Sequence, residues 1–283
     1  MDITRVAVIG TGTMGSGIAQ TIAVAGIPVT MVDREQTIVD RAQQTIERQL
    51  RRGVERGRMS QDDAGVALSL IDTDISVDAA ADADLVIEAV PEVQSMKNDI
   101  FARLDEVCRP DAILASNTSS ISITSLGAAT ARPQRVIGMH FFNPVPLMEL
   151  VEVVRGLQTT DDVVDTVVAF AGRLGKTPVA VNDFPGFISN RVLMPMINEA
   201  IFCLMEGVAS AEAIDNVMRL GMKHPMGPLA LADLIGLDVC LDILVVLQRD
   251  LGEDKYRPCP LLRKMVAAGR LGRKAHEGFY RYE

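Results

Sequence analysis

The chain has 283 residues, of which 48% are hydrophobic and 23% are charged, and its formal net charge is −9. This composition is typical of a globular protein that holds one large domain or two ordinary ones. The negative charge argues against nucleic acid as a partner, because nucleic acid is bound by a basic surface.

Membrane-spanning and metal-dependent proteins are not indicated either. No run of 18 apolar residues is free of charges, and residues 1–5 lead directly into a strand pattern. We therefore expect no membrane span and no signal peptide. No cluster of His, Cys or carboxylate side chains has the spacing of a metal site. The four cysteines lie far apart, which is typical of a reducing compartment, and we expect the cytoplasm.

An apolar run over 6–9 is followed directly by a glycine motif made of Gly10, Thr11, Gly12, Thr13, Met14 and Gly15. Between a strand and a helix, such glycines permit a tight turn, close approach of a pyrophosphate and packing of helix on strand. A second apolar run ends in Asp33, at the spacing of a ribose-binding carboxylate. The motif predicts NAD binding, because a carboxylate repels the 2′-phosphate of NADP. The adjacent Arg34 keeps NADP as an alternative.

A helical pattern that begins at Gln36 leads into a basic cluster of Arg48, Arg51, Arg52, Arg56 and Arg58. One interpretation is a solvated helix face. The other is a site for a phosphate-rich part of a substrate, since arginine binds phosphate with two parallel hydrogen bonds.

Strand patterns alternate with helical ones up to about residue 181. Residues 1–184 are therefore predicted to form a Rossmann-type, doubly wound and mostly parallel sheet. Two strands, over 85–90 and 112–115, lead into polar segments that hold Glu92 and residues 116–120. Ligands bind at the carboxyl ends of such strands, although Ser and Asn are also ordinary turn and cap residues there.

Two apolar runs, 136–142 and 147–154, flank a short segment with two prolines, which predicts a strand, a sharp connection and a second strand. Antiparallel pairing about Pro146 sets His140 opposite Glu152. A buried carboxylate needs a hydrogen-bond donor, and a carboxylate beside a histidine fixes the tautomer of a general base. A structural pair, or an exposed glutamate, is the alternative.

Beyond residue 184 the pattern is helical over 187–206, 210–220, 228–251 and 260–268. We expect residues 185–283 to form a separate all-helical domain for substrate binding and dimerisation. Its apolar residues exceed the needs of one small bundle, which indicates a homodimer face; a larger core is the alternative. This excess includes Val192, Leu193, Met196, Ile197, Leu241, Leu244 and Val245.

The chain resembles the 3-hydroxyacyl-CoA dehydrogenase family, especially the short bacterial 3-hydroxybutyryl-CoA dehydrogenases. The resemblance spans nearly the whole chain and includes several long motifs peculiar to the family. The motifs are the glycine loop 10–15, 116–120, 138–146, 183–187 with Asn190 and Arg191, 224–229 and 233–238. Near the C-terminus, Ala275 and His276 stand where the family usually has Ser-Gly.

The resemblance implies roles for individual residues. His140 matches the general base and Glu152 the carboxylate that orients it. Ser119 and Asn190 match the groups that hold the substrate around its 3-oxygen and thioester. Cofactor positions are matched by Asp33, Glu92, Lys97, Asn117, Ser119 and Asn143, and CoA-binding positions by Arg52 and Arg56.

The implied activity is the NAD-dependent interconversion of short-chain (S)-3-hydroxyacyl-CoA and 3-ketoacyl-CoA, with an acyl-CoA as the substrate partner. Two alternatives remain at this point. One is a dehydrogenase of the same fold that acts on a free hydroxy acid or sugar acid. The other is a non-catalytic NAD-binding protein, which the presence of His140, Glu152, Ser119 and Asn190 disfavours.

Overall fold

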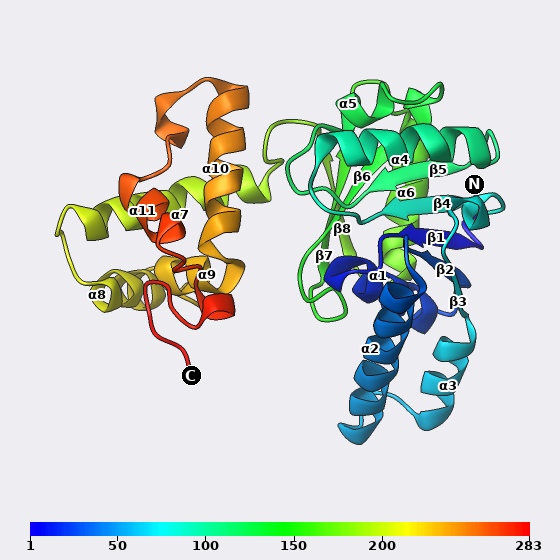
Figure 1. Cartoon of the computed structure of the whole chain (residues 1–283), viewed down its shortest axis with the longest axis horizontal. Helices are drawn as coiled ribbons and strands as arrows, with labels where there is room; N and C mark the ends of the chain where they lie inside the picture. Colours follow the sequence, from blue (N-terminus) through cyan, green and yellow to red (C-terminus); the bar gives the residue numbers. More distant parts are fainter. The chain divides into compact units, whose positions relative to one another are not determined.

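The computed structural model describes all 283 residues, and the chain divides into two compact units, Met1–Phe184 and Pro185–Glu283 (Figure 1). The first unit contains a sheet with helices on its two faces, and the second contains helices only. The predicted doubly wound, mostly parallel sheet and the helical C-terminal domain are confirmed.

The first unit is built on one eight-stranded sheet with the strand order β3-β2-β1-β4-β5-β6-β7-β8. All neighbouring strands are parallel except β6 and β7, so β7 and β8 run opposite to the others. The strands are β1 (Val6–Ile9), β2 (Val29–Val32), β3 (Ile71–Asp74), β4 (Leu85–Glu88), β5 (Ile113–Ser116), β6 (Val136–Phe141), β7 (Leu150–Arg155) and β8 (Thr177–Asn182). The central parallel strands β1, β4 and β5 are short, mostly apolar and fully buried, as expected where both faces of a sheet are covered.

Helices connect the strands of the first unit. They are α1 (Thr13–Val24), α2 (Gln36–Glu55), α3 (Gln61–Ser69), α4 (Gln94–Val107), α5 (Ile123–Gly127) and α6 (Asp161–Arg173), with short 3₁₀ turns η1 (Val77–Ala80) and η2 (Pro133–Arg135). Ser60 begins α3 with a capping box, since its hydroxyl accepts from the Asp63 N–H at 3.0 Å. The α2–α3 pair extends away from the strands (Figure 1).

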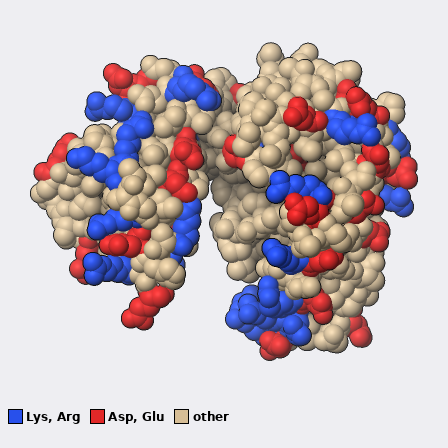
Figure 2. Space-filling model, viewed as in Figure 1, with Lys and Arg blue, Asp and Glu red and all other residues tan.

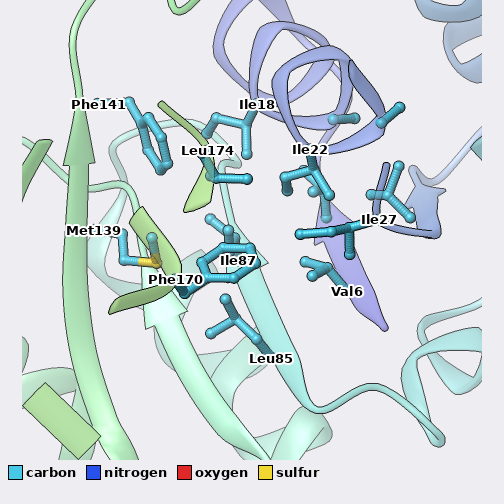
Figure 3. Packing of buried hydrophobic residues seen from close by; sticks show 14 of the residues in the cluster. Val6, Ile18, Ile22, Ile27, Leu85, Ile87, Met139, Phe141, Phe170 and Leu174 are labelled. Atoms are coloured by element: carbon cyan, nitrogen blue, oxygen red, sulfur yellow. The ribbon is translucent and has the colours of Figure 1, made fainter. Parts of the chain in front are cut away.

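The core of the first unit lies between one face of the sheet and helices α1 and α6. Figure 3 shows Ile18 and Ile22 of α1 and Phe170 of α6 packed against strand residues such as Leu85 and Met139. Successive strand residues point to opposite faces, and Gly138 of β6 faces α5, because a Cβ added there would lie 2.9 Å from Ile123 Cδ1. His140, two residues further, points to that same face.

The second unit packs its helices around its own core, with Ile197, Leu237 and Leu244 at 0% exposure. Its elements are α7 (Ser189–Met205), α8 (Ala211–Asn216), a π-helical turn η3 (Val217–Gly221), α9 (Pro228–Ile235), α10 (Leu237–Leu251), η4 (Asp254–Tyr256), α11 (Pro260–Ala267) and η5 (Arg273–Ala275).

Two expectations for this unit are corrected. The single helix expected over 228–251 is two helices, because Gly236 has φ 106° and interrupts the helical hydrogen bonding. Of the apolar residues assigned to an outer face, Ile197 and Leu244 lie in the core, whereas Val192 and Val245 are exposed. No helix in either unit combines the length and the apolar character that crossing a membrane requires.

Candidate active site

The antiparallel pair β6–β7 places His140 directly opposite Glu152, as the sequence predicts. His140 Nδ1 lies 2.8 Å from Glu152 Oε2, and the two residues are only 7% and 2% exposed. An ionised carboxylate can only accept, so the proton of this hydrogen bond belongs to Nδ1 and the basic nitrogen is Nε2. Burial among apolar neighbours strengthens this pairing, because little water competes for either group. The Phe142 ring packs on the imidazole, with ring centroids 4.5 Å apart.

The polar loop after β5 is held by a carboxylate. Glu92 Oε1 accepts hydrogen bonds from the Thr118 hydroxyl at 2.5 Å and from the Ser119 and Ser120 N–H groups at 3.0 and 3.1 Å. Glu92 Oε2 lies 3.3 Å from the Lys97 ammonium. Burial raises the pKa of Glu92, but the charge of Lys97 and these hydrogen bonds outweigh it and hold the pKa below its usual value. Glu92, Lys97 and Ser119 thus form one ordered cluster.

This cluster rests on a second, fully buried carboxylate. Glu88, the last residue of β4, accepts from Lys97 Nζ at 2.7 Å, from the Ser116 hydroxyl at 2.6 Å and from the Val90 N–H at 2.7 Å. Glu88 and Lys97 have side-chain exposures of 0% and 1%. A charge buried this deeply is tolerated only when it is paired and hydrogen-bonded. The ammonium of Lys97 is therefore fixed between two carboxylates.

Asn117 connects the loop to the histidine strand. Its Oδ1 accepts from the Phe141 N–H at 3.0 Å, and its own N–H donates to the Glu88 carbonyl at 2.8 Å. Because Phe141 is adjacent to His140, Asn117 links the carboxylate cluster to the His140–Glu152 pair within the first unit. Asn143 lies three residues beyond His140, exposed in the connection between β6 and β7.

The first turn of the sheet fits a dinucleotide. Gly10 has φ 94°, and a Cβ on Gly15 would lie 1.8 Å from the Gly10 carbonyl oxygen, so both positions require glycine. A Cβ on Gly12 would meet nothing within 4 Å, which leaves open space at the N-terminus of α1, where phosphates bind. Asp33 Oδ2 accepts from the Thr11 N–H at 2.7 Å and its hydroxyl at 3.0 Å.

The remaining two residues of the motif have different surroundings. Thr13 is exposed at the first residue of α1, whereas Met14 is half-buried and packs on the core. Asp33, Thr11 and the glycines therefore come together in one cradle at the end of β1.

A groove of about 840 Å³ lies beside this cradle, wholly within the first unit. Its walls are one face of α1, the C-terminal end of α2, and the connections before β7 and β8. Five cationic residues line it: Arg52, Arg56, Arg58, Arg173 and Lys176. The salt bridges of this unit do not include Arg52, Arg56 or Arg58. Figure 2 shows basic side chains gathered over the far end of α2.

The groove also borders the segment that follows His140. Asn143 and Val145 line it, and Lys176 Nζ donates to the Val145 and Met148 carbonyls at 2.6 and 2.8 Å. Burial lowers the pKa of Lys176, and the nearby Glu149 carboxylate opposes that effect. One groove thus runs from the connection that follows His140 to the arginine cluster.

Asn190 belongs to the second unit, in the first turn of α7, where it is 8% exposed. Its role beside the substrate, which the family resemblance implies, stays a prediction. In the C-terminal segment, Lys274 Nζ lies 2.5 Å from Asp238 Oδ2. No group of three or more His, Cys, Asp or Glu side chains could hold a metal ion in either unit.

Comparison with known proteins decides the family. A sequence model described as "3-hydroxyacyl-CoA dehydrogenase, NAD binding domain" matches residues 5–184, and one described as "3-hydroxyacyl-CoA dehydrogenase, C-terminal domain" matches residues 186–282. The chain belongs to the 3-hydroxyacyl-CoA dehydrogenase family. It is an NAD-dependent dehydrogenase, with the NAD-binding domain in its first unit.

Individual relatives cover the dehydrogenase from end to end. The probable 3-hydroxybutyryl-CoA dehydrogenase of Bacillus subtilis is 55% identical over 283 residues, which cover 100% of this chain and 99% of the relative. The mitochondrial hydroxyacyl-coenzyme A dehydrogenase of Homo sapiens is 42% identical and is covered over 92% of its length, against 99% of this chain. The crystal structure of (S)-3-hydroxybutyryl-CoA dehydrogenase PaaH1 from Ralstonia eutropha has 48% identity and a TM-score of 0.97, with full coverage of both chains.

Several residues that surround the candidate site were not singled out from the sequence. Glu88 could have been found from the sequence, because it is a carboxylate in an otherwise apolar strand. The same pattern indicates Glu152. Ser116 and Thr118 lie in the polar segment 116–120 that the sequence places at a strand end, but their bonds to Glu88 and Glu92 could not be predicted from it. Gln20 and Lys176 gave no signal, because their position beside the groove depends on packing between elements far apart in the chain.

Proposed function

We propose that this dehydrogenase interconverts short-chain (S)-3-hydroxyacyl-CoA, such as 3-hydroxybutyryl-CoA, and the corresponding 3-ketoacyl-CoA. The observation that carries the proposal is the His140–Glu152 pair, at 2.8 Å, in the same unit as the NAD cradle and a cationic groove. Relatives that carry the 3-hydroxybutyryl-CoA dehydrogenase name, at 55% and 52% identity over 100% and 99% of the chain, support the choice of substrate.

His140 acts as the general base in the direction of oxidation. Its Nε2 takes the proton of the 3-hydroxyl, and Glu152 stabilises the imidazolium that results. Glu152 also keeps the proton of the neutral ring on Nδ1, so that Nε2 is basic before each turnover. When bound, NAD accepts the hydride that leaves C3. In the reverse direction the same nitrogen returns the proton to the 3-oxygen.

The polar loop after β5 supplies hydrogen-bond donors to the substrate. Ser119 is anchored by Glu92, which accepts from its N–H at 3.0 Å and lies 3.4 Å from its hydroxyl. We assign the hydroxyl as a donor to the substrate oxygen that gains charge in the transition state. The fixed Lys97–Glu92 pair keeps the loop in place on the cofactor side.

The cationic groove is the binding site for the CoA part of the substrate. CoA carries three phosphate groups, and a chain with a net charge of −9 must gather positive charge locally to bind them. Arg52 and Arg56 line the groove, and neither forms a salt bridge with a carboxylate of the protein. Their guanidinium groups can therefore pair with the phosphate groups of a ligand. The solvated-face interpretation remains for Arg48 and Arg51, which do not line the groove.

The second unit carries the proposed homodimer face. Val192, Val208, Val217, Leu220 and Met222 expose 61–69% of their surface, more large apolar area than a lone small domain usually leaves in water. We expect a dimer in sedimentation equilibrium and a shift toward monomer in a Val192→Glu variant. A monomeric wild-type protein would contradict the dimer. A cytoplasmic location also stays a prediction.

The proposed activity is tested by initial rates of the purified enzyme with acetoacetyl-CoA, with free acetoacetate in parallel and with NADH and NADPH compared. We expect rapid NADH oxidation with the CoA thioester and little with the free acid. Preference for acetoacetate would favour the free hydroxy acid reading, and no turnover with either, while NADH still binds, would contradict both.

A further inference from the structure

Thr11 holds the carboxylate of Asp33 with its side chain as well as with its backbone. The Thr11 N–H and the Thr11 hydroxyl donate to Asp33 Oδ2 at 2.7 and 3.0 Å. Thr11 is only 4% exposed, whereas Asp33, directly after β2, is half-buried. The middle residue of a Gly-x-Gly turn has no required side chain. The buried hydroxyl is therefore a further contact that this chain makes to the carboxylate.

The second oxygen of the carboxylate is held as well. Asp33 Oδ1 accepts from the Arg34 N–H at 2.8 Å. An ionised carboxylate has about four acceptor positions, and three of those on Asp33 are filled by Thr11 and Arg34. Because these donors act on both oxygens, they restrain the rotation of the side chain as well as its position. A hydrogen bond to an ionised group is stronger than one between neutral groups, so the Thr11 hydroxyl contributes strongly to this restraint.

A restrained carboxylate at this position discriminates between the two nicotinamide cofactors. NAD and NADP differ only at the 2′-oxygen of the adenosine ribose, which is a hydroxyl in NAD and a phosphate in NADP. A fixed Asp33 accepts a hydrogen bond from the hydroxyl and repels the phosphate. A carboxylate free to rotate could turn away from the phosphate and leave it to Arg34. The Arg34 side chain is 77% exposed and lies 3.4 Å from Glu35, an exposed pair that holds it weakly.

We propose that Thr11 is a positioning residue for cofactor selection, because its hydroxyl fixes the Asp33 carboxylate and this restraint sets the preference for NAD over NADP. Asp33 makes the contact to the ribose, and Thr11 acts through it. The two possible roles of the hydroxyl have different consequences. If it only supported the loop, its loss would weaken both cofactors alike. If it restrains Asp33, its loss weakens NAD and favours NADP.

The test is a fluorescence titration with NADH and with NADPH, without acyl substrate, of Thr11→Val and Thr11→Ser. Valine keeps the shape of the side chain and removes the hydroxyl, whereas serine retains the hydroxyl. In Thr11→Val we expect weaker NADH binding and tighter NADPH binding. The ratio of the NADPH Kd to the NADH Kd should fall about tenfold, the value of one hydrogen bond to a charged group. Thr11→Ser should keep the wild-type ratio.

The matched control is Thr45→Val. Thr45 lies on α2, and its hydroxyl bonds to Arg41 and Arg48 of the same helix. This substitution should change neither dissociation constant. If it shifted the ratio as Thr11→Val does, the effect would not come from Asp33 and the inference would fail.

Two further results would overturn the inference. One is an unchanged ratio in Thr11→Val, with both cofactors weakened equally, and the other is a Thr11→Ser variant that behaves like Thr11→Val. Thr11→Ala also lacks the hydroxyl and is too small to crowd the turn, so it gives the same test if valine prevents folding. These titrations need no acyl substrate. Their outcome is therefore separate from that of the acetoacetyl-CoA assay, and either claim can fail without the other.

Discussion

Glu88 and Glu152 are two carboxylates inside otherwise apolar strands, and each is buried against a single basic side chain. Glu152 pairs with His140 at 2.8 Å and Glu88 with Lys97 at 2.7 Å. The first pair contains an imidazole, which can both accept and donate a proton through its two ring nitrogens, and this suits proton transfer. The second contains a lysine fixed by three acceptors, Glu88, Glu92 and the Val90 carbonyl, which suits a permanent charge.

Removing the charge of Glu88 is expected to destabilise the fold. Glu88→Gln leaves the ammonium of Lys97 buried with only Glu92 as its counter-charge, and we expect the free energy of unfolding to fall by about 2–4 kcal/mol. Urea denaturation measures this change. The matched control is Glu106→Gln, which breaks an exposed pair with Arg103 and should change stability by less than about 0.5 kcal/mol. Equal effects of the two substitutions would contradict the structural role of Glu88.

Residue patterns alone located one of these glutamates and not the other. His140 and Glu152 are related by the symmetry of a hairpin about Pro146, so the spacing in the sequence contains their pairing. The partner of Glu88 comes from helix α4, and only the packing of α4 beside β4 and β5 brings Lys97 to it. A carboxylate within an apolar run therefore indicates a buried donor without saying which element provides it.

The connection between β6 and β7 joins the strand that holds His140 to the groove. It is held from the side by Lys176, which donates to two of its carbonyls. It also packs on α1 at Gly17, where a larger residue would crowd Val145. These two contacts fix the position of the connection, and with it the position of Asn143 at the edge of the groove.

Loosening this connection is expected to slow turnover more than it lowers stability. Lys176→Met removes both hydrogen bonds to the connection. We expect kcat to fall about 3–10-fold, because a small displacement of groups that position the substrate slows the reaction strongly. Hydrogen exchange of amides in 143–149 should become faster. Lys176→Arg, which still donates, should recover most of kcat. Unchanged exchange in Lys176→Met would contradict the positioning role.

Helix and strand patterns predicted most elements, and the failures share a physical cause. The apolar pattern of 228–251 continues through Gly236, but the positive φ of that glycine divides α9 from α10. Strand β3 was not anticipated because its sequence, Ile71–Asp74, contains two aspartates and one threonine. It lies at the edge of the sheet, where polar residues are tolerated.

On the scale of the whole chain, Asp84 joins segments that lie far apart in sequence. Its carboxylate accepts from the Thr4 N–H and hydroxyl, both at 2.8 Å, and from Arg109 at 2.5 Å. Burial raises the pKa of Asp84, but the hydrogen bonds from Thr4 and Arg109 outweigh it and lower the pKa below its usual value. The start of β1 is thereby tied to the segments before β4 and β5.

The sign of this shift gives a pH dependence. A carboxylate whose pKa is lower in the folded state stabilises the fold above its unfolded pKa, and this contribution is lost as the pH falls through the folded pKa. We expect Asp84→Asn to lose about 1–2 kcal/mol of unfolding free energy at pH 7. The difference from the wild type should shrink below about pH 4. Urea denaturation at several pH values measures it, and a constant difference across that range would contradict the assignment.

We propose that His140 and Glu152 form the proton-transferring pair of this NAD-dependent 3-hydroxyacyl-CoA dehydrogenase. The most direct test is turnover of acetoacetyl-CoA by His140→Ala and Glu152→Gln, measured beside an NADH titration of each variant. We predict that kcat falls about 10²–10⁴-fold in His140→Ala and at least about tenfold in Glu152→Gln, with NADH affinity nearly intact. Near-wild-type turnover in both variants would contradict the claim.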